Sequence, residues 1–493
     1  PDFVPPEAPV AQEWVESEGE TLKRESAEHS DWWKVFNDPV LDSLIQTAYQ
    51  QNLSLQIAGL RVLQARAQLG IVTGDLYPQL QEMSGDYSRV KNPGTPSDYF
   101  NEGSFGFDAA WELDFWGKFR RGIESADANL IASIASYDDV LVTLTAEVAR
   151  TYVQIRTFQE RIRLAEENIV IQKRALELAT VQFEVGTVTE LDLQQAKTNL
   201  RSTQASVPGF QISLRQAQHA LSILMGMPPG DLSTLLGDAS AIPIPPAEVA
   251  VGIPADLLRR RPDIKQAELL AAAQCAQIGV ARSELFPSFS LNGTMGWSAN
   301  NSGENSLGDM FTKTSYGFSF GPSFAWNFLN YGRLKNQVRV QDALFEQTLI
   351  NYKVTVLNAA QEVEDAMVGF LLSKIQTNFL KESAEAAKRS SDLSMLQYKE
   401  GIVDYQRVLD SNLSLTQQQD QYAQTKGEII TNLIAVYKAL GGGWQVRLGQ
   451  DFVPLAVQEE MSERTDWGEL LEITNETAPV LDSEKSLLRK PDW

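Results

Sequence analysis

The sequence predicts an α+β membrane protein that is built from two copies of one structural unit. Three observations lead to this fold class. Corresponding motifs recur 215 positions apart, long segments without proline place apolar residues at heptad spacing, and shorter segments alternate aromatic residues with small or polar ones. Recurrent motifs indicate a duplication, heptads indicate long packed helices, and alternation indicates strands with one apolar face.

The composition excludes several classes of protein. The chain has 493 residues and a net charge of −22, which argues against nucleic-acid binding because phosphates attract basic surfaces. No run of about 18 apolar residues occurs, so a transmembrane helix is not expected. The single cysteine, Cys275, excludes an internal disulfide. The chain opens at Pro1 without a methionine, and we expect a mature product from which a targeting segment has been removed.

The repeat is clearest at two hairpin-like motifs, "QFEVGTVTELDL" and "QYKEGIVDYQRVL". The glycine pairs that share the offset are Gly117 and Gly332, Gly186 and Gly401, and Gly226 and Gly441. A single register over roughly 110 residues indicates duplication. The predicted parts are an N-terminal extended segment (1–38), a first repeat (39–229), a linker between the repeats (230–254), a second repeat (255–444) and a C-terminal segment (445–493).

Each unit is predicted to contain a helix, two strands, a very long helix and a shorter helix. In the first unit, apolar positions alternate at spacings of four and three from Leu144 to Phe183, which is a coiled-coil pattern. No proline occurs between Gly117 and Gly186, so the long helix can extend to roughly 100 Å. The shorter helix (190–225) covers about half that length. We therefore expect the unit's first helix (39–76) to stack end to end with it against the long helix.

The strands are expected as two pairs, within 77–115 and 287–328. In "TSYGFSFGPSFAWNFLNYGR" the aromatic residues occupy every second position, and small residues lie between them. In the first pair the polar face includes the carboxylates of Asp108, Glu112 and Asp114. Leu80 and Met83 break the alternation, so we expect a β-bulge after Pro78. Pro322 lacks an N–H group, which conflicts with a regular strand around it.

These strands fit a tilted transmembrane β-barrel whose aromatic face meets lipid and whose polar face meets water. A water-soluble sandwich is the alternative, but no other predicted sheet is available to cover the aromatic face. Four strands cannot close a barrel, so copies of the chain must pool their strands. Two copies provide eight strands, whose side chains fill the interior, and three provide twelve, which leave a channel.

The chain resembles the TolC-type outer-membrane efflux ducts, in particular the lipoprotein branch that works with resistance-nodulation-division pumps. The resemblance extends from "WWKVFNDPVLDSLIQTAYQQN" to "LIAVYKALGGGW", and its most specific motif is "GIPADLLRRRPDIKQAELLAAAQCAQIGVARSELFPSFSL". It implies a homotrimer with a 12-stranded barrel in the outer membrane, an α-helical barrel across the periplasm and an equatorial domain. It also implies a periplasmic adaptor, an inner-membrane pump, no cofactor, and a lipid anchor upstream of Pro1.

The resemblance implies that the two hairpin tips dock the adaptor and close the duct. The docking residues carried over by motif are Gly186, Thr187, Val188, Gly401, Ile402 and Val403. The expected gate residues are Asp410, Gln406, Arg407, Asp404, Tyr405 and Asp192. Asp410 matches the family's gating aspartate, and three copies around an axis would favour cations. Many relatives have a leucine plug where this chain has Gln406, and Arg407 is the candidate for closing ion pairs with Asp404 or Asp192.

Other functions are less well supported by the sequence. An enzyme is disfavoured because the only histidines are His29 and His219, and no phosphate-binding loop, metal-ligand cluster or nucleophile motif is present. A periplasmic coiled-coil scaffold would explain the heptads but not the aromatic strands. The exit duct of a type I polypeptide secretion system is the alternative within the same fold. The exported compound is not specified by any residue pattern.

Overall fold

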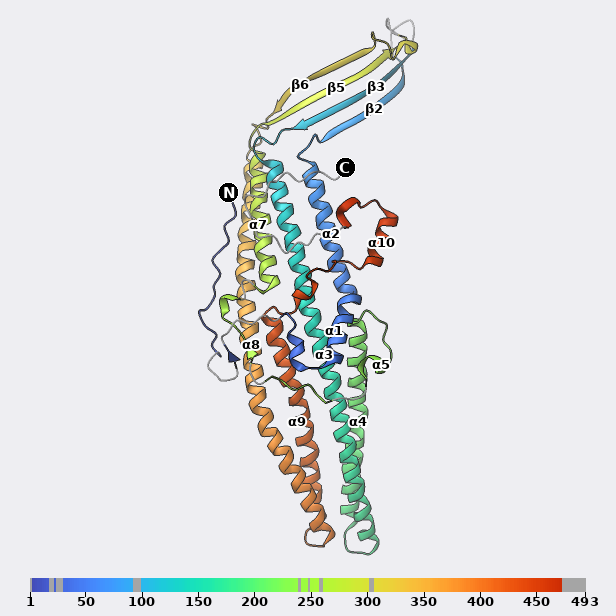
Figure 1. Ribbon diagram of the computed structural model, residues 1–493, viewed down its shortest axis with the longest axis vertical. Helices are drawn as coiled ribbons and strands as arrows, with labels where there is room; N and C mark the ends of the chain where they lie inside the picture. The colour runs from blue at the N-terminus through green and yellow to red at the C-terminus, as the bar shows by residue number, and fades with distance from the viewer. Residues whose placement is uncertain are drawn as a thin grey trace.

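The computed structural model describes residues 2–16, 22–23, 30–91, 99–237, 241–246, 249–256, 260–300 and 306–471. The chain is strongly elongated: a four-stranded sheet lies at one end, long helices run down the middle, and two helix hairpins form the other end (Figure 1). Most of the chain is helical. Among the described helices, none is long and apolar enough to cross a membrane.

The two repeats contain matching elements. In the first repeat these are α1 (Pro39–Gln51), α2 (Leu53–Gly74), β2 (Leu80–Lys91), β3 (Tyr99–Glu112), α3 (Lys118–Glu184) and α4 (Glu190–Leu224). In the second they are α7 (Pro262–Ser283), β5 (Ser288–Asn300), β6 (Tyr316–Ala325), α8 (Arg333–Lys399) and α9 (Tyr405–Ala439). The long helices α3 and α8 both have 67 residues, and α4 and α9 both have 35. These equal lengths agree with the expected duplication.

The expected helix over 39–76 is wrong in one respect, because it is divided into α1 and α2 at Asn52. The Asn52 side chain accepts a hydrogen bond from the Leu55 N–H at 2.9 Å and donates one to the carbonyl of Leu224, also at 2.9 Å. Asn52 therefore both caps α2 and joins it to the end of α4. Gly226 lies so close to this joint that a Cβ atom would come within 2.2 Å of the Gln51 carbonyl. The end-to-end stacking of the short helices against α3 is thus confirmed.

The long helices also join the two repeats. Helix α3 contacts α1, α2 and α4 of its own repeat, and it contacts α7 and α9 of the other. Helix α8 packs against α7 and α9 (Figure 1). The heptad positions of α3 are mostly buried, as Val148, Ile155 and Ala179 illustrate at 0% exposure. The heptad pattern therefore correctly identified the buried face of this helix.

The sheet is antiparallel with the strand order β2-β3-β5-β6. Its register places Phe105, Trp297 and Tyr316 in one row on the aromatic face. Pro322 lies opposite Leu291 on β6, an edge strand of this sheet, so the missing N–H disturbs only one side.

The expected β-bulge after Pro78 is wrong. Residues 80–91 pair continuously with 110–99. Leu80 lies opposite Ala110 on the polar face, at the end of the strand nearest the helices. The alternation of apolar and polar residues is broken by this one apolar residue on the polar face, and not by an extra residue in the strand.

Both strand pairs end earlier than expected, β3 at Glu112 and β6 at Ala325. The reason at β3 is Asp114, whose carboxylate accepts the N–H groups of Phe119 and Arg120 at 3.1 and 3.0 Å and thereby caps α3. It also pairs with the Arg120 side chain at 2.9 Å, and its own side chain is only 9% exposed. The expected role of Asp114 as a carboxylate on the polar strand face is therefore wrong.

Most of the remaining described elements lie beside the helices, and the short 3-10 helix η3 (Leu307–Asp309) lies against β3 and β5 of the sheet. The short elements are β1 (Leu22–Lys23), η1 (Trp32–Phe36), α5 (Ser233–Leu236), β4 (Val249–Ala250), η2 (Pro254–Asp256), η3 (Leu307–Asp309), η4 (Trp444–Arg447), α10 (Leu455–Arg464) and η5 (Gly468–Leu471). Strands β1 and β4 pair in parallel, and α10 lies beside α2 (Figure 1). Parts of the predicted linker and C-terminal segment (238–240, 247–248 and 472–493) and Pro1 lie outside the described residues, and the division into parts stays a prediction.

Candidate functional site

The two hairpin tips, at the end farthest from the sheet, have the same backbone turn. Gly186 and Gly401 have φ angles of 79° and 73°, in the left-handed region that favours glycine. The N–H group of the next residue, Thr187 or Ile402, donates to a carbonyl five residues earlier at 2.9 Å in both tips. This pattern is a glycine-dependent helix stop. The hairpin turns that the repeated motifs predicted at these two glycines are therefore both present.

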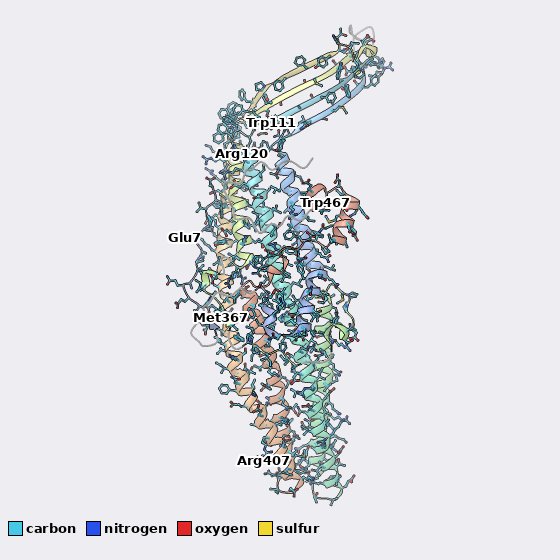
Figure 2. All side chains as sticks on the ribbon, viewed as in Figure 1. Glu7, Trp111, Arg120, Met367, Arg407 and Trp467 are labelled. Atoms are coloured by element: carbon cyan, nitrogen blue, oxygen red, sulfur yellow. The ribbon has the colours of Figure 1, made fainter. Side chains whose placement is uncertain are left out.

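Carboxylates cap the helices that leave the tips. Thr189 accepts the N–H of Asp192 at 3.4 Å, and the Asp192 carboxylate accepts the N–H of Thr189 at 2.9 Å. In the second tip Asp404 accepts the backbone N–H of Arg407 at 3.2 Å. Negative charge is favourable at a helix N-terminus, so both carboxylates stabilise local structure. Within the described residues, no carboxylate lies within ion-pair distance of the Arg407 side chain, which Figure 2 places at this end of the molecule.

Gln406 and Asp410 lie together on one exposed face of α9. The Gln406 side-chain amide donates a hydrogen bond to the Asp410 carboxylate at 2.9 Å, one helical turn away. Leu413 continues the same face and is 49% exposed. The structure thus brings together the two residues that the sequence analysis placed at the constriction, on a surface that the rest of the chain leaves uncovered.

Tyr405 points away from this face. It is 2% exposed, and its ring packs edge-on against Tyr398 with the ring centroids 5.5 Å apart. The cluster around it joins the two hairpins and contains Ala175, Ala179, Ala196, Tyr398, Tyr405 and Val408. Burial raises the pKa of both Tyr398 and Tyr405 to about 12. In this conformation Tyr405 therefore holds one hairpin against the other and contributes nothing to the exposed face.

The expected docking residues differ in their exposure. Ile402 is 71% exposed, and Thr187 is exposed beside Gly186. Val188 and Val403 are half-buried against the cluster that contains Tyr405. Each tip thus presents one outward residue and anchors the next one inward.

A set of polar contacts between the hairpins was not predicted from the sequence. Arg161 donates to both carboxylate oxygens of Asp420 at 2.7 and 2.9 Å, and Asn168 donates to Gln419 at 2.8 Å. Gln172 of α3 also donates to Thr416 of α9, whereas Ser391 with Asn412 and Ser394 with Ser411 join α8 to α9 within the second hairpin. The only signal in the sequence was polar residues at heptad positions, such as Gln172. Polar contacts thus add to the apolar cluster around Tyr405, and water can replace these polar contacts when the hairpins separate.

Comparison with known proteins agrees with this architecture. A family model described as "Outer membrane efflux protein" matches residues 44–227 and 253–442. The chain is 32% identical to nodulation protein T of Rhizobium leguminosarum bv. trifolii, over 90% of this chain and 94% of that protein. It is 30% identical to the toluene efflux pump outer membrane protein TtgC of Pseudomonas putida, over 91% and 93%.

A solved structure is similar over almost its full length. The outer-membrane channel OprN superposes with a TM-score of 0.84 at 32% identity, covering 90% of this chain and 99% of that one. The matched family model, the relatives and the shared fold all indicate the same family. The chain belongs to the outer membrane efflux protein family, and it is a passive exit duct of the Gram-negative outer membrane rather than an enzyme.

Proposed function

We propose that three copies of this chain form a 12-stranded transmembrane barrel that continues as an α-helical duct across the periplasm. The observation that carries this proposal is the division of the sheet into two faces. Phe318, Phe320 and Phe324 lie on one face and are 72 to 74% exposed, while Asp108 and Glu112 lie on the other. An aromatic face of this size needs lipid around it, and a carboxylate face needs water.

The edges of the sheet support pooling of strands between copies. β2 and β6 each pair on one side only within the chain, so a row of N–H and C=O groups on each is available for another strand. Such groups must be paired inside a membrane. Pairing β6 of one copy with β2 of the next satisfies both edges and closes the barrel. Three copies leave a channel inside, whereas two would leave an interior filled by side chains.

The helix tips are the proposed gate and docking region. Around a threefold axis, the exposed face with Gln406 and Asp410 would meet its own copies, and repulsion among three carboxylates would favour a cation between them. Because Gln406 is polar, the constriction would lack an apolar plug. Arg407 would close the tips by pairing with a carboxylate of a neighbouring copy, since Asp192 and Asp404 of its own chain cap helices.

The proposed partners meet the duct at its tips. The turns at Gly186 and Gly401, with Thr187, Ile402 and the half-buried Val188 and Val403, would contact a periplasmic adaptor. An inner-membrane resistance-nodulation-division pump would supply the exported small molecules, such as drugs or other toxic compounds. TtgC is named as part of a toluene efflux pump, which supports an apolar small-molecule cargo. Export of a polypeptide is the alternative.

The barrel is tested by arginine substitutions at neighbouring positions of β6. Phe320 lies on the aromatic face opposite Gly293, and Ser319 lies on the polar face opposite Thr294. Phe320→Arg should prevent assembly of heat-modifiable trimers, because an arginine at mid-membrane costs about 2–4 kcal/mol per copy. Ser319→Arg should assemble and change the conductance. Equal tolerance of the two substitutions would contradict the barrel.

A further inference from the structure

The charged residues of the four strands are divided between the two faces of the sheet. The strand carboxylates all lie on the polar face: Glu82, Asp86, Glu102, Asp108 and Glu112. The strand cations are Arg89 and Lys91, and both lie on the aromatic face. Strands β5 and β6 contain no charged residue. A cation on the face that meets lipid needs an anion nearby, so this placement requires an explanation.

Both cations lie at the end of the sheet that is farthest from the helices. Lys91 pairs with Tyr99 and Arg89 pairs with Asn101, whereas β2 begins next to α2 at Leu80. Figure 1 shows this end of β2 and β3 pointing away from the helical body. In the membrane orientation proposed above, the helices lie in the periplasm, so Arg89 and Lys91 lie at the outer surface of the membrane.

The two cations are held beside one aromatic ring. The Arg89 guanidinium carbon lies 4.9 Å from the centre of the Tyr99 ring, and the Lys91 ammonium lies 5.5 Å from it. Cation–π contacts orient charged groups without neutralising them. All three side chains are exposed, and within the described part of the chain no carboxylate lies within ion-pair distance of either cation.

The chemistry of the outer surface favours one ligand. The outer leaflet of this type of membrane is composed of lipopolysaccharide, whose lipid A carries phosphate groups at the surface. A guanidinium binds phosphate through two parallel hydrogen bonds, and an ammonium adds a compact positive charge. Carboxylates of the sheet would repel such a ligand, and they all lie on the opposite face.

We propose that Arg89, Lys91 and Tyr99 form a binding site for a lipid A phosphate of lipopolysaccharide on the outer rim of the barrel. This inference rests on the proposed transmembrane barrel and adds a lipid ligand to it. The acyl chains of the bound lipid would lie against Tyr87 and Met83, which are on the same face of β2 as the two cations.

The test compares lipid retention by purified full-length trimers. The variant Arg89→Gln/Lys91→Gln removes both cations, and Lys173→Gln/Arg174→Gln removes the same charge from exposed positions of α3 as a control. Each protein is incubated in detergent with bis-phosphorylated lipid A, with dephosphorylated lipid A or with phosphatidylglycerol, and bound lipid is measured by native mass spectrometry. Tyr99→Leu removes the aromatic ring, and Tyr99→Phe keeps it.

We expect the double variant to lose about 25-fold in affinity for bis-phosphorylated lipid A, since each of the two surface cations contributes about a factor of five. The control should match the wild type, Tyr99→Phe should retain binding, and Tyr99→Leu should weaken it. Affinity for phosphatidylglycerol equal to that for bis-phosphorylated lipid A would overturn the assignment to lipopolysaccharide. Equal binding by wild type and double variant would overturn the site itself, even if the trimers still require detergent. Trimers that need no detergent and bind no lipid would instead overturn the barrel.

Discussion

Arg161 on α3 donates two hydrogen bonds to the carboxylate of Asp420 on α9, at 2.7 and 2.9 Å, and so joins the first hairpin to the second. The same guanidinium lies 4.3 Å from the centre of the Phe210 ring on α4. The Arg161 side chain is only 16% exposed. One residue therefore connects three helices above the tips.

Arg161→Gln should loosen the tips. The substitution removes a bidentate pair between the hairpins, which we expect to contribute about 1 kcal/mol, or roughly a fivefold shift toward an open arrangement. Planar-bilayer recordings of trimers should show a higher resting conductance. Arg163→Gln is the matched control, because the ion pairs of Arg163 within the described part of the chain are with Glu160 and Glu167 of its own helix. A resting conductance equal in both variants would contradict a role of Arg161 in holding the hairpins together.

Asp410→Ala should reduce the preference of the channel for cations. The substitution removes three like charges from the proposed constriction and frees the Gln406 amide that now donates to Asp410. Reversal potentials measured in a salt gradient report the selectivity directly. An unchanged reversal potential would place the selective constriction elsewhere in the duct.

Gln406→Leu should lower the resting conductance. Three leucines around a narrow axis would form the apolar plug that the glutamine does not provide, and an apolar constriction excludes water. Leu413→Ala is the control: it changes the apolar volume one turn beyond Asp410 on the same face, away from position 406. We expect it to leave the resting conductance near that of the wild type. Gln406→Leu channels that conduct like the wild type would show that this position does not line the narrowest point.

The stability of the helical body should fall as the pH rises from about 4 to about 6. Burial raises the pKa of Asp139 on α3 to about 6 from an ordinary value of 3.8, and the nearby Asp263 carboxylate adds to the shift. The folded chain therefore binds this proton more tightly than the unfolded chain, so the stabilisation is present below pH 4 and lost as the pH rises through about 6.

Asp139→Asn should remove this loss. We expect the variant to have a higher thermal midpoint than the wild type at pH 7.5, with a smaller difference at pH 4.5, as measured by circular dichroism of the helices. Glu166→Gln, an exposed position of the same helix, is the control and should show no such dependence. A difference that grows toward low pH would have the wrong sign for a raised carboxylate pKa.

The periodic parts of the fold were predictable from the sequence. The heptad from Leu144 onward identified the buried face of α3, and the alternation around Phe320 identified the two faces of β6. These patterns predict structure correctly because one face of each element meets a uniform environment, so the same kind of side chain recurs along that face. The break at Asn52 and the cap at Asp114 were not predicted, since each depends on a single hydrogen-bonding side chain with no repeating pattern around it.

The candidate site was predictable in position but not in detail. The repeated glycines located both tips, and motif resemblance placed Gln406 and Asp410 together. Tyr405 follows the same motif, yet it lies one residue around the helix and is buried against Tyr398 of α8, the other helix of the hairpin. The polar contacts between the hairpins were missed because partners such as Arg161 and Asp420 are 259 positions apart in sequence.

The matching lengths of α3 and α8, and of α4 and α9, bring both tips of one chain to the same level. If three chains assemble around an axis, the end of the duct displays six turns of nearly equal shape. A partner that recognises the glycine turn can then attach at every turn, and its attachments reinforce one another through high effective concentration. Thr187 and Ile402 alternate around this rim, so a partner that distinguishes a hydroxyl from an aliphatic side chain would find three sites of each kind.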